Sequence, residues 1–514
     1  MSKLLLDKNY EKQLLAFVII QPLIDIYRVF FESKIQFLGI ALSEWINFGA
    51  FGYLCILFIV KYFRRVKYYI PLIAYGVIFL VYFALHAWNI LQFDENILND
   101  TDINVLKELY FMLRVYLIPL VVFYMMLCAK ITMTQFEKVA NCLSWMISGV
   151  IVITNLLKIS FISYAGTLEK NTYINRNIIE WFTNPDLENI AYMTSKGWFY
   201  MGNQIGVILF VLYPFTVMCA MKYKNIKSFV LMILQGIAMI MVSTKVAAIG
   251  CILILIVAIM IGIVFGLILN QFSFGLKDVM KFLCVGIGLV LLLVNSPIIT
   301  MQGQRENAYI IDEEEQALKE EVKKMEKELK QEGNVNKALI RNFAKVIAKH
   351  PYAYGIEREF IELFDVEENY MFWYNIVISE NNAHVDYRRL KTMIYEEVLR
   401  VNDNKYDRWL GIGYTSNFPY MEKDPHGQNV WFGYLGTLVL IGPYFLCVSY
   451  VIFYILKHRK TNLHYENAFF AVSLGGISVL GLMAGHLFFG IFSIVIFAFL
   501  VASFYHIQKE MVLE

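Results

Sequence analysis

Apolar runs of about 20 residues recur along most of this chain. At 1.5 Å per residue, such a run forms a helix long enough to cross a hydrocarbon core of about 30 Å. We therefore predict an all-α integral membrane protein with about 12 transmembrane helices. The predicted spans are 13–31, 36–60, 70–91, 109–129, 140–160, 202–221, 228–243, 246–269, 280–298, 429–456, 466–486 and 488–506.

Basic residues distinguish the two faces of this predicted bundle. Lysine and arginine in short loops are retained on the cytoplasmic side of a membrane. The two termini and the even-numbered loops carry 18 of them, whereas the short odd-numbered loops carry 6. We therefore predict a multi-pass protein whose two termini both lie in the cytoplasm.

One long segment, 299–428, separates the last three predicted spans from the first nine. It contains 18 basic and 24 acidic residues, and the predicted orientation places it outside. Glu-to-Lys pairs three and four residues apart predict a solvated helix over 312–331. The predicted organisation is nine transmembrane helices in 1–298, a large, mostly helical extracytoplasmic loop domain in 299–428, and three transmembrane helices in 429–514.

Composition narrows the class of protein further. The chain has 514 residues, of which 58% are hydrophobic and 17% are charged, with a net charge of +2. A soluble domain typically carries about 25% charge, and nothing in this balance indicates nucleic-acid binding. All seven cysteines fall within apolar runs, so neither a disulfide framework nor a zinc cluster is indicated.

Ionisable side chains in or beside the predicted spans gather at the predicted outer face. Such a group costs several kcal/mol inside a bilayer unless it is paired or faces water, so each one is a candidate for function. The set consists of Asp25, Arg28, His86, Arg114, Lys245, His486, Arg305 and His426.

Most of these side chains also have a purely structural interpretation. Asp25 and Arg28 are three residues apart and could neutralise each other on one helix face. Arg114 could extend to the headgroups, and His86, like His486, could be a packed histidine. For Lys245 a structural and an anion-binding role stay equally open, because a basic residue on the outer side departs from the charge bias.

A set of cations at one membrane face suits an anionic lipid. Arginine offers a planar fork to two phosphate oxygens and lysine offers a point charge, and both act more strongly in a partly dehydrated site. We therefore predict recognition of a lipid diphosphate at the outer leaflet. The chain has no Walker loop, dinucleotide-binding glycine turn, HExxH or GxSxG motif. Segment 299–428 has no Asp-x-Asp pair, so we expect neither a cofactor nor a metal.

Four short motifs follow one another between residues 243 and 442. In this order, with the large external segment between spans 9 and 10, they resemble the O-antigen ligase and O-antigen polymerase superfamily of bacterial membrane glycosyltransferases. They are Ser243-Thr244-Lys245 at the start of a span, Gly303-Gln304-Arg305 after the ninth span, His350-Pro351 ahead of Gly355, and His426-Gly427-Gln428-Asn429 leading into a span with Gly433, Gly436 and Gly442.

The resemblance implies a GT-C-like fold and a reaction without metal. A glycan would move from undecaprenyl diphosphate to an acceptor hydroxyl on the outer face of the bacterial cytoplasmic membrane. The motifs imply that Lys245 and Arg305 hold the diphosphate and that His426 orients or deprotonates the acceptor. Fixed cations would stabilise the departing diphosphate, and a histidine accepts a hydroxyl proton at neutral pH.

Three further residues complete the candidate site. The same motifs make Asn429 and His350 candidate substrate-binding residues. Arg114 is added because its depth and side match those of the other cations.

The expected partners are an undecaprenyl-diphosphate-linked glycan donor, a glycan or cell-wall acceptor, membrane lipids and other polysaccharide-assembly proteins, with no nucleic acid. Polymerase and ligase activities cannot be distinguished by the sequence, although an amino-acid composition rich in Lys, Ile, Asn and Tyr favours a polymerase-like role in a Gram-positive envelope.

Two other functional classes stay open: a lipid-linked oligosaccharide flippase or polysaccharide exporter, and a non-enzymatic assembly partner. A transporter would place cations along a path to both faces, whereas the cations here are one-sided.

Overall fold

The structure of the chain is a computed structural model. It describes residues 3–31, 36–37, 40–164, 172–186, 189–299, 337–349, 351, 356, 358–379, 387–419, 424–459, 464–483, 485, 487–488 and 490–513. In these ranges the one sheet is an antiparallel hairpin of β1 (Gln36–Phe37) and β2 (Ile40–Ala41). The described chain is otherwise built from helices and their connections, which confirms the predicted all-α class.

Eight helices of the described chain are long and apolar enough to cross a membrane, and a bent pair, His426–Leu440 with Gly442–Lys457 at 43°, makes nine if it is one span. The prediction of about 12 spans is therefore too high for these residues. The eight are Asn9–Phe31, Leu42–Tyr62, Val66–Ile90, Val105–Cys128, Met133–Leu156, Gly202–Tyr223, Lys245–Ile268 and Ile491–Gln508.

Two predicted spans form helices that are too short or too polar to meet the same requirement, and a third, 466–486, extends beyond the described residues. α9 (Ile226–Val242) has 17 residues, which gives about 26 Å at 1.5 Å per residue. α11 (Leu276–Val294) carries Lys277, Asp278 and Lys281 near its start. α22 (Tyr465–Met483) corresponds to the third predicted span, whose end at residue 486 lies outside the described residues. An apolar average over 20 residues does not separate such helices from true spans.

The chain divides into two compact units. The first comprises Met1–Gly76, Leu113–Gly303 and Leu440–Glu514. Besides α9, α11, α22 and the hairpin, it contains α1 (Lys3–Phe31), α2 (Leu42–Tyr62), η1 (Val66–Tyr68), η2 (Leu113–Leu117), α5 (Ile118–Cys128), α6 (Met133–Leu156), α7 (Glu180–Thr183), η4 (Ile190–Met193), α8 (Gly202–Tyr223), α10 (Lys245–Ile261), η5 (Gly262–Ile268), α20 (Gly442–Lys457) and α23 (Ile491–Leu513).

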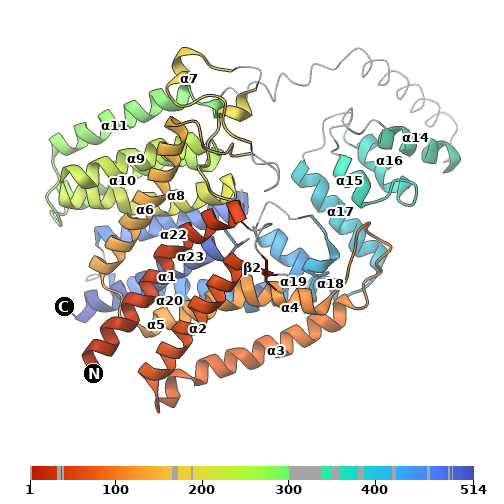
Figure 1. Cartoon of the computed structure of the whole chain (residues 1–514), viewed down its shortest axis with the longest axis horizontal. Helices are drawn as coiled ribbons and strands as arrows, with labels where there is room; N and C mark the ends of the chain where they lie inside the picture. Colours follow the sequence, from red (N-terminus) through yellow and green to blue (C-terminus); the bar gives the residue numbers. More distant parts are fainter. Residues whose placement is uncertain are drawn as a thin grey trace. The chain divides into compact units, whose positions relative to one another are not determined.

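α8 is the central helix of the first unit. Its whole apolar stretch is buried, because α6, α9, α10 and α22 all pack against it (Figure 1). Phe215 of α8 lies with its ring centroid 4.7 Å from that of Phe136 in α6 and 4.8 Å from that of Phe470 in α22. Since lipid is as apolar as these side chains, close van der Waals packing rather than exclusion from water stabilises such a bundle in a bilayer.

The second unit comprises Val77–Met112 and Gln304–Val439. The described part of the predicted external segment is mostly helical, as expected, whereas the predicted helix over 312–331 lies outside the described residues. The helices are α3 (Ile70–Ile90, which begins in the first unit), α4 (Val105–Met112), α14 (Lys337–Lys349), α15 (Arg358–Leu363), α16 (Tyr370–Ser379), α17 (Tyr387–Asn402), α18 (Asp407–Leu410), η7 (Tyr414–Ser416) and α19 (Asp424–Leu440).

Candidate functional site

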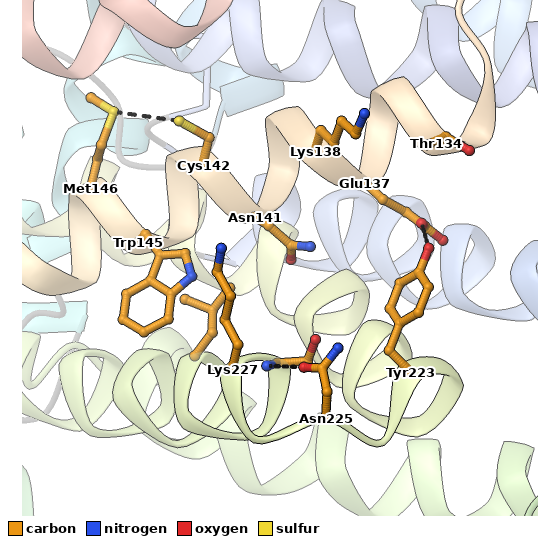
Figure 2. A pocket seen from close by; sticks show the side chains of 12 residues that line it. Thr134, Glu137, Lys138, Asn141, Cys142, Trp145, Met146, Tyr223, Asn225 and Lys227 are labelled. Carbon is orange, nitrogen blue, oxygen red and sulfur yellow. Dashed lines mark hydrogen bonds between the residues drawn. The ribbon is translucent and has the colours of Figure 1, made fainter.

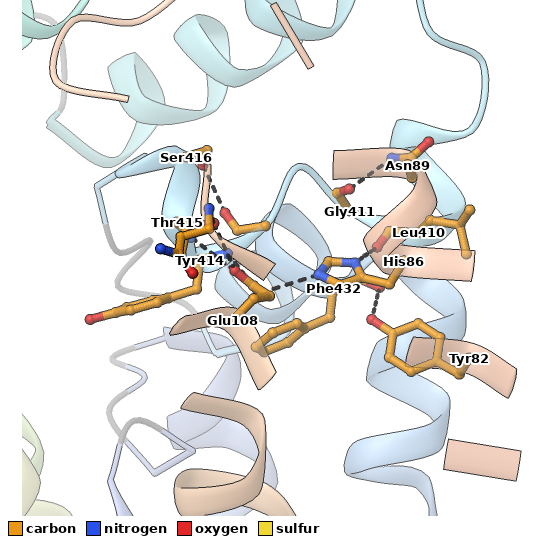
Figure 3. Close-up of polar contacts among 12 residues, drawn as sticks. Tyr82, His86, Asn89, Glu108, Leu410, Gly411, Tyr414, Thr415, Ser416 and Phe432 are labelled. Atoms are coloured by element: carbon orange, nitrogen blue, oxygen red, sulfur yellow. Dashed lines mark hydrogen bonds and ion pairs between the residues drawn. The ribbon is translucent and has the colours of Figure 1, made fainter. Parts of the chain in front are cut away.

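A stripe of buried polar side chains lies on one face of α3. Tyr82, His86 and Asn89 are spaced by four and three residues, so they share a helix face. All three are buried, His86 and Asn89 completely. Each contacts the segment 407–432 of the same unit, which leads into and through α19 (Figure 3).

His86 forms a buried ion pair with Glu108 of α4. Its Nε2 lies 3.2 Å from Glu108 Oε1, and its Nδ1 lies 2.5 Å from the carbonyl oxygen of Leu410. Both ring nitrogens thus face oxygen acceptors. Neither side chain has any solvent exposure.

The Glu108 carboxylate also holds the 3₁₀ turn η7. It accepts hydrogen bonds from the backbone N–H groups of Tyr414 at 3.0 Å and Thr415 at 2.9 Å, and from the Thr415 hydroxyl at 3.2 Å. A buried charge is tolerated only when its hydrogen-bonding capacity is used in this way. The carboxylate therefore fixes the loop between α18 and α19 to α4.

Asn89 connects the end of α3 to α18. Its amide nitrogen donates to Asp407 Oδ1 and to the carbonyl oxygen of Gly411, both at 2.9 Å. Burial raises the pKa of Asp407, while hydrogen bonds from Asn402 and Asn89 act in the opposite direction. Asn89 thus joins the buried Asp407 carboxylate to the loop after α18, which Glu108 holds further along at η7.

α19 is broken at Gly433, where φ is 66°. The backbone of the α18 loop lies against this break, because a Cβ at Gly433 would overlap the Trp409 backbone and one at Gly411 (φ 83°) would overlap that of Trp431. The break leaves helical carbonyl oxygens without intrahelical partners. Their donors are the N–H groups of Ile412 and Gly413, at 2.9 and 3.0 Å from the oxygens of Val430 and Trp431, and the Tyr82 hydroxyl, at 2.9 Å from that of Phe432.

His426 and Asn429 lie in the first half of this broken helix. His426 is its third residue and is exposed. Asn429 is half-buried, and its Oδ1 accepts a hydrogen bond from Thr437 at 2.8 Å, across the break. The network around Glu108 therefore supports the segment that carries the predicted catalytic histidine.

Lys245 is the first residue of α10, after a short turn from α9. Ser243 adopts the left-handed conformation that ends α9, and Thr244 caps α10 by accepting the N–H of Ala247 at 3.3 Å. The Tyr164 hydroxyl also donates a hydrogen bond to the Ser243 carbonyl oxygen in this turn, at 2.8 Å. Lys245 itself is exposed, and within the described residues it forms no ion pair.

Arg114 lies in η2, a π-helical turn within the span Val105–Cys128. Its guanidinium forms an ion pair with Glu44 of α2. Such π-helical turns are frequent at functional sites, but the carboxylate already offsets this positive charge. Arg114 is therefore less available to an anion than Lys245 is.

A second polar cluster surrounds Tyr200, ahead of α8. Asp25 of α1 accepts the Tyr200 N–H at 3.0 Å, and the Arg28 guanidinium lies 4.2 Å from the ring centroid. Lys196 is 1% exposed and donates to the Tyr200 carbonyl oxygen at 2.9 Å. Burial lowers the pKa of this lysine to about 8, and the charge of Asp25 acts in the opposite direction.

The predicted site residues are thus distributed over both units. Lys245 and Arg114 belong to the first unit, His426 and Asn429 to the second. Three others lie outside the described residues, namely Arg305, His350 and His486.

Sequence reasoning named His86 but missed its partners. Glu108 follows 22 residues later, and no local pattern connects the two. The spacing of Tyr82, His86 and Asn89 on an otherwise apolar helix is the signal that could have revealed a structural polar stripe. Among the described residues, no group of three histidine, cysteine or acidic side chains is placed to hold a metal ion.

Comparison with known proteins gives one match. The profile of a protein family described as "O-antigen ligase like membrane protein" matches residues 7–509. Neither a curated protein nor a solved structure matches the chain.

Proposed function

Because the chain belongs to the O-antigen ligase-like membrane protein family, we propose that it transfers a glycan from undecaprenyl diphosphate to an acceptor hydroxyl at the outer membrane face. Membership implies a multi-pass membrane protein, a ligase-type enzyme and lipid-linked glycan substrates. The proposal adds the reaction, its independence of metal ions and the residues that perform it.

The observation that carries the proposal is the presentation of Lys245. This lysine projects from the first turn of α10, exposed, and within the described residues no carboxylate pairs with it. The N-terminal end of a helix also favours anions, because its N–H groups carry partial positive charge. Lys245 thus offers an uncompensated cation to a diphosphate.

In the proposed reaction the acceptor oxygen forms a bond to the anomeric carbon of the donor glycan. The bond between that carbon and the diphosphate oxygen breaks, and undecaprenyl diphosphate leaves with the electron pair. His426 orients the acceptor hydroxyl and takes its proton. Lys245 and Arg305 stabilise the negative charge that develops on the diphosphate.

The remaining candidates have supporting roles. Asn429 and His350 bind the substrate. Arg114 is a third contact for the diphosphate, although its guanidinium is also paired with Glu44. The proposal includes the predicted orientation, in which both termini lie in the cytoplasm and these roles belong to the outer face.

A deletion strain tests the reaction. If the protein is a polymerase, its loss shortens the surface polysaccharide; if it is a ligase, full-length polymer accumulates on the lipid carrier. Purified protein supplied with lipid-linked glycan should remain active in EDTA. Unchanged polysaccharide in the deletion strain, or activity that needs magnesium or manganese, would contradict the proposal.

Orientation is tested separately by cysteine labelling in a cysteine-free variant. An impermeant thiol reagent should label a cysteine at Gly333 in intact cells and should leave one at Arg65 unlabelled. Labelling at Arg65 would reverse the topology and remove every role assigned above.

A further inference from the structure

A groove lies between α6 and α9, at the end of the first unit where both helices begin. It encloses about 540 Å³ and is lined by α6 from Thr134 to Met146 and by the segment 223–231. Figure 2 shows Lys227 extending from α9 towards α6, with Trp145 beside it. None of the residues considered for glycan transfer lines this groove.

The polarity of the groove changes along its length. On α6, Lys138 and Asn141 precede Trp145 and Met146; on α9, Lys227 precedes Leu231 in the same direction. Lys138 and Met146 are eight positions apart, which corresponds to about 12 Å of helix. A charged end followed within this distance by an apolar end matches the headgroup and the first acyl carbons of a phospholipid.

The uncompensated charge in the groove is positive. Glu137 is buried, and its carboxylate is satisfied by Lys222 at 2.8 Å and by the hydroxyl of Tyr223. Lys138 and Lys227 are exposed, and neither forms an ion pair within the described part of the chain. An anionic group would therefore meet two available ammonium groups.

Asn141 adds a requirement for a hydrogen-bond donor. Its amide nitrogen lies 3.5 Å from Cys219 Sγ, whereas its buried Oδ1 has no partner among the described residues. A buried acceptor without a donor loses free energy that a ligand hydroxyl would recover. The groove thus suits a headgroup that carries both a phosphate and a hydroxyl.

The groove also lies at the basic end of the bundle. Lys130 and Lys224 flank it in sequence, together with Lys138, Lys222 and Lys227, at the end that the charge bias assigns to the cytoplasmic leaflet. Trp145 lies near the middle of α6, about 10 Å further along the helix than Lys138, where an acyl chain would follow the headgroup.

We propose that this groove binds an anionic phospholipid of the phosphatidylglycerol type. Lys227 and Lys138 contact the phosphate, Asn141 accepts a hydrogen bond from a headgroup hydroxyl, and Trp145, Met146 and Leu231 contact the acyl chain. The proposal does not depend on the transfer reaction.

Lipid titration of the full-length protein in uncharged detergent, followed by native mass spectrometry, tests this site. Dioleoyl phosphatidylglycerol should bind more tightly than dioleoyl phosphatidylcholine. Lys227→Gln should weaken phosphatidylglycerol binding about fivefold, the effect of one lysine at an anionic membrane surface. Lys277→Gln, at an exposed lysine outside the groove, is the matched control and should leave binding unchanged.

A second variant tests the headgroup hydroxyl. The wild-type protein should prefer phosphatidylglycerol to phosphatidic acid, and Asn141→Ala should abolish that preference while retaining binding of both. Equal binding of phosphatidylcholine, an equal effect of Lys277→Gln, or a preference that survives Asn141→Ala would overturn the proposal. Soluble glycerol phosphate that competes at the same concentration as the lipid would instead show a site for a free anion.

Discussion

Ionisable side chains lie near the ends of spans in two regions, the turn between α9 and α10 and the contact between α3 and α4. The two regions differ in whether these side chains are exposed and whether they are paired. At the turn, Lys245 is exposed and has no ion-pair partner among the described residues. At the contact, His86 and Glu108 are fully buried and paired with each other. An ionisable residue in a span is therefore a functional candidate only after its partner is known.

The two regions differ in the free energy needed to desolvate the charged groups and in whether those groups can still bind a ligand. A buried ion pair is costly to desolvate and persists only when its remaining donors and acceptors are used. Glu108 meets this condition with three hydrogen bonds to η7 besides His86. The Glu108 carboxylate is therefore fully hydrogen-bonded within the protein, where it fixes the loop that leads to α19. Lys245, in contrast, is available to a ligand.

Removal of Glu108 should have the largest effect. Glu108→Ala leaves the buried imidazole of His86 and two backbone N–H groups without their acceptor, so we expect a loss of about 3–5 kcal/mol in the free energy of unfolding. Thermal unfolding of purified protein measures the loss as a lowered Tm. Glu396→Ala, which breaks the exposed ion pair with Arg408, is the control and should cost less than about 1 kcal/mol. Equal Tm values for both variants would show that burial does not distinguish these pairs.

His426 should affect catalysis without affecting stability, because it is exposed at the start of α19. We expect His426→Ala to lower turnover by about 10²-fold, the contribution of a general base, while Tm stays the same. His426→Gln separates the two roles proposed for this residue: glutamine forms hydrogen bonds but does not accept the proton. Recovery of turnover in His426→Gln would indicate orientation alone, and normal turnover in a well-folded His426→Ala protein would remove His426 from the mechanism.

Lys245 should affect donor binding by a smaller amount. We expect Lys245→Gln to raise the Kd for the lipid-diphosphate donor about tenfold, the lower end of the range for a hydrogen bond to a charged group. Lys245→Arg should restore most of the affinity, since it retains the charge. Lys158→Gln is a matched control, because Lys158 is already paired with Glu180 at 2.7 Å. A Kd unchanged in Lys245→Gln would assign Lys245 a structural role.

The helices and the position of Lys245 were predictable because both depend on local patterns. Apolar runs mark the spans, and a polar turn before such a run places Lys245 at a helix start. The partners of His86 and Gly433 were not predictable in this way. Glu108 and the Trp409 backbone reach them only through the tertiary arrangement of α3, α4 and the α18 loop.

The overestimate of the number of spans has a similar origin. α9 is apolar along its length but ends after 17 residues at Ser243. Its neighbours make it part of the bundle, since it packs against α6, α8 and α10. A helix enclosed by protein needs an apolar surface as much as one enclosed by lipid does, so composition alone does not reveal which solvent it faces.

Lys196 combines the features of the two regions, because it is a buried cation whose proton is weakly held. Its pKa of about 8 in the folded protein lies below the ordinary value of 10.5. Between these values the unfolded chain binds more protons than the folded one, so stability should rise with pH. The free energy of unfolding should increase by about 1 kcal/mol between pH 8 and pH 9, and Lys196 should cause no pH dependence well below pH 8.

Tm measured across this range for the wild type and for Lys196→Met tests the effect, since the variant lacks the titrating group. An identical rise in both proteins would assign the pH dependence to other groups and leave Lys196 charged throughout, as a paired lysine would be.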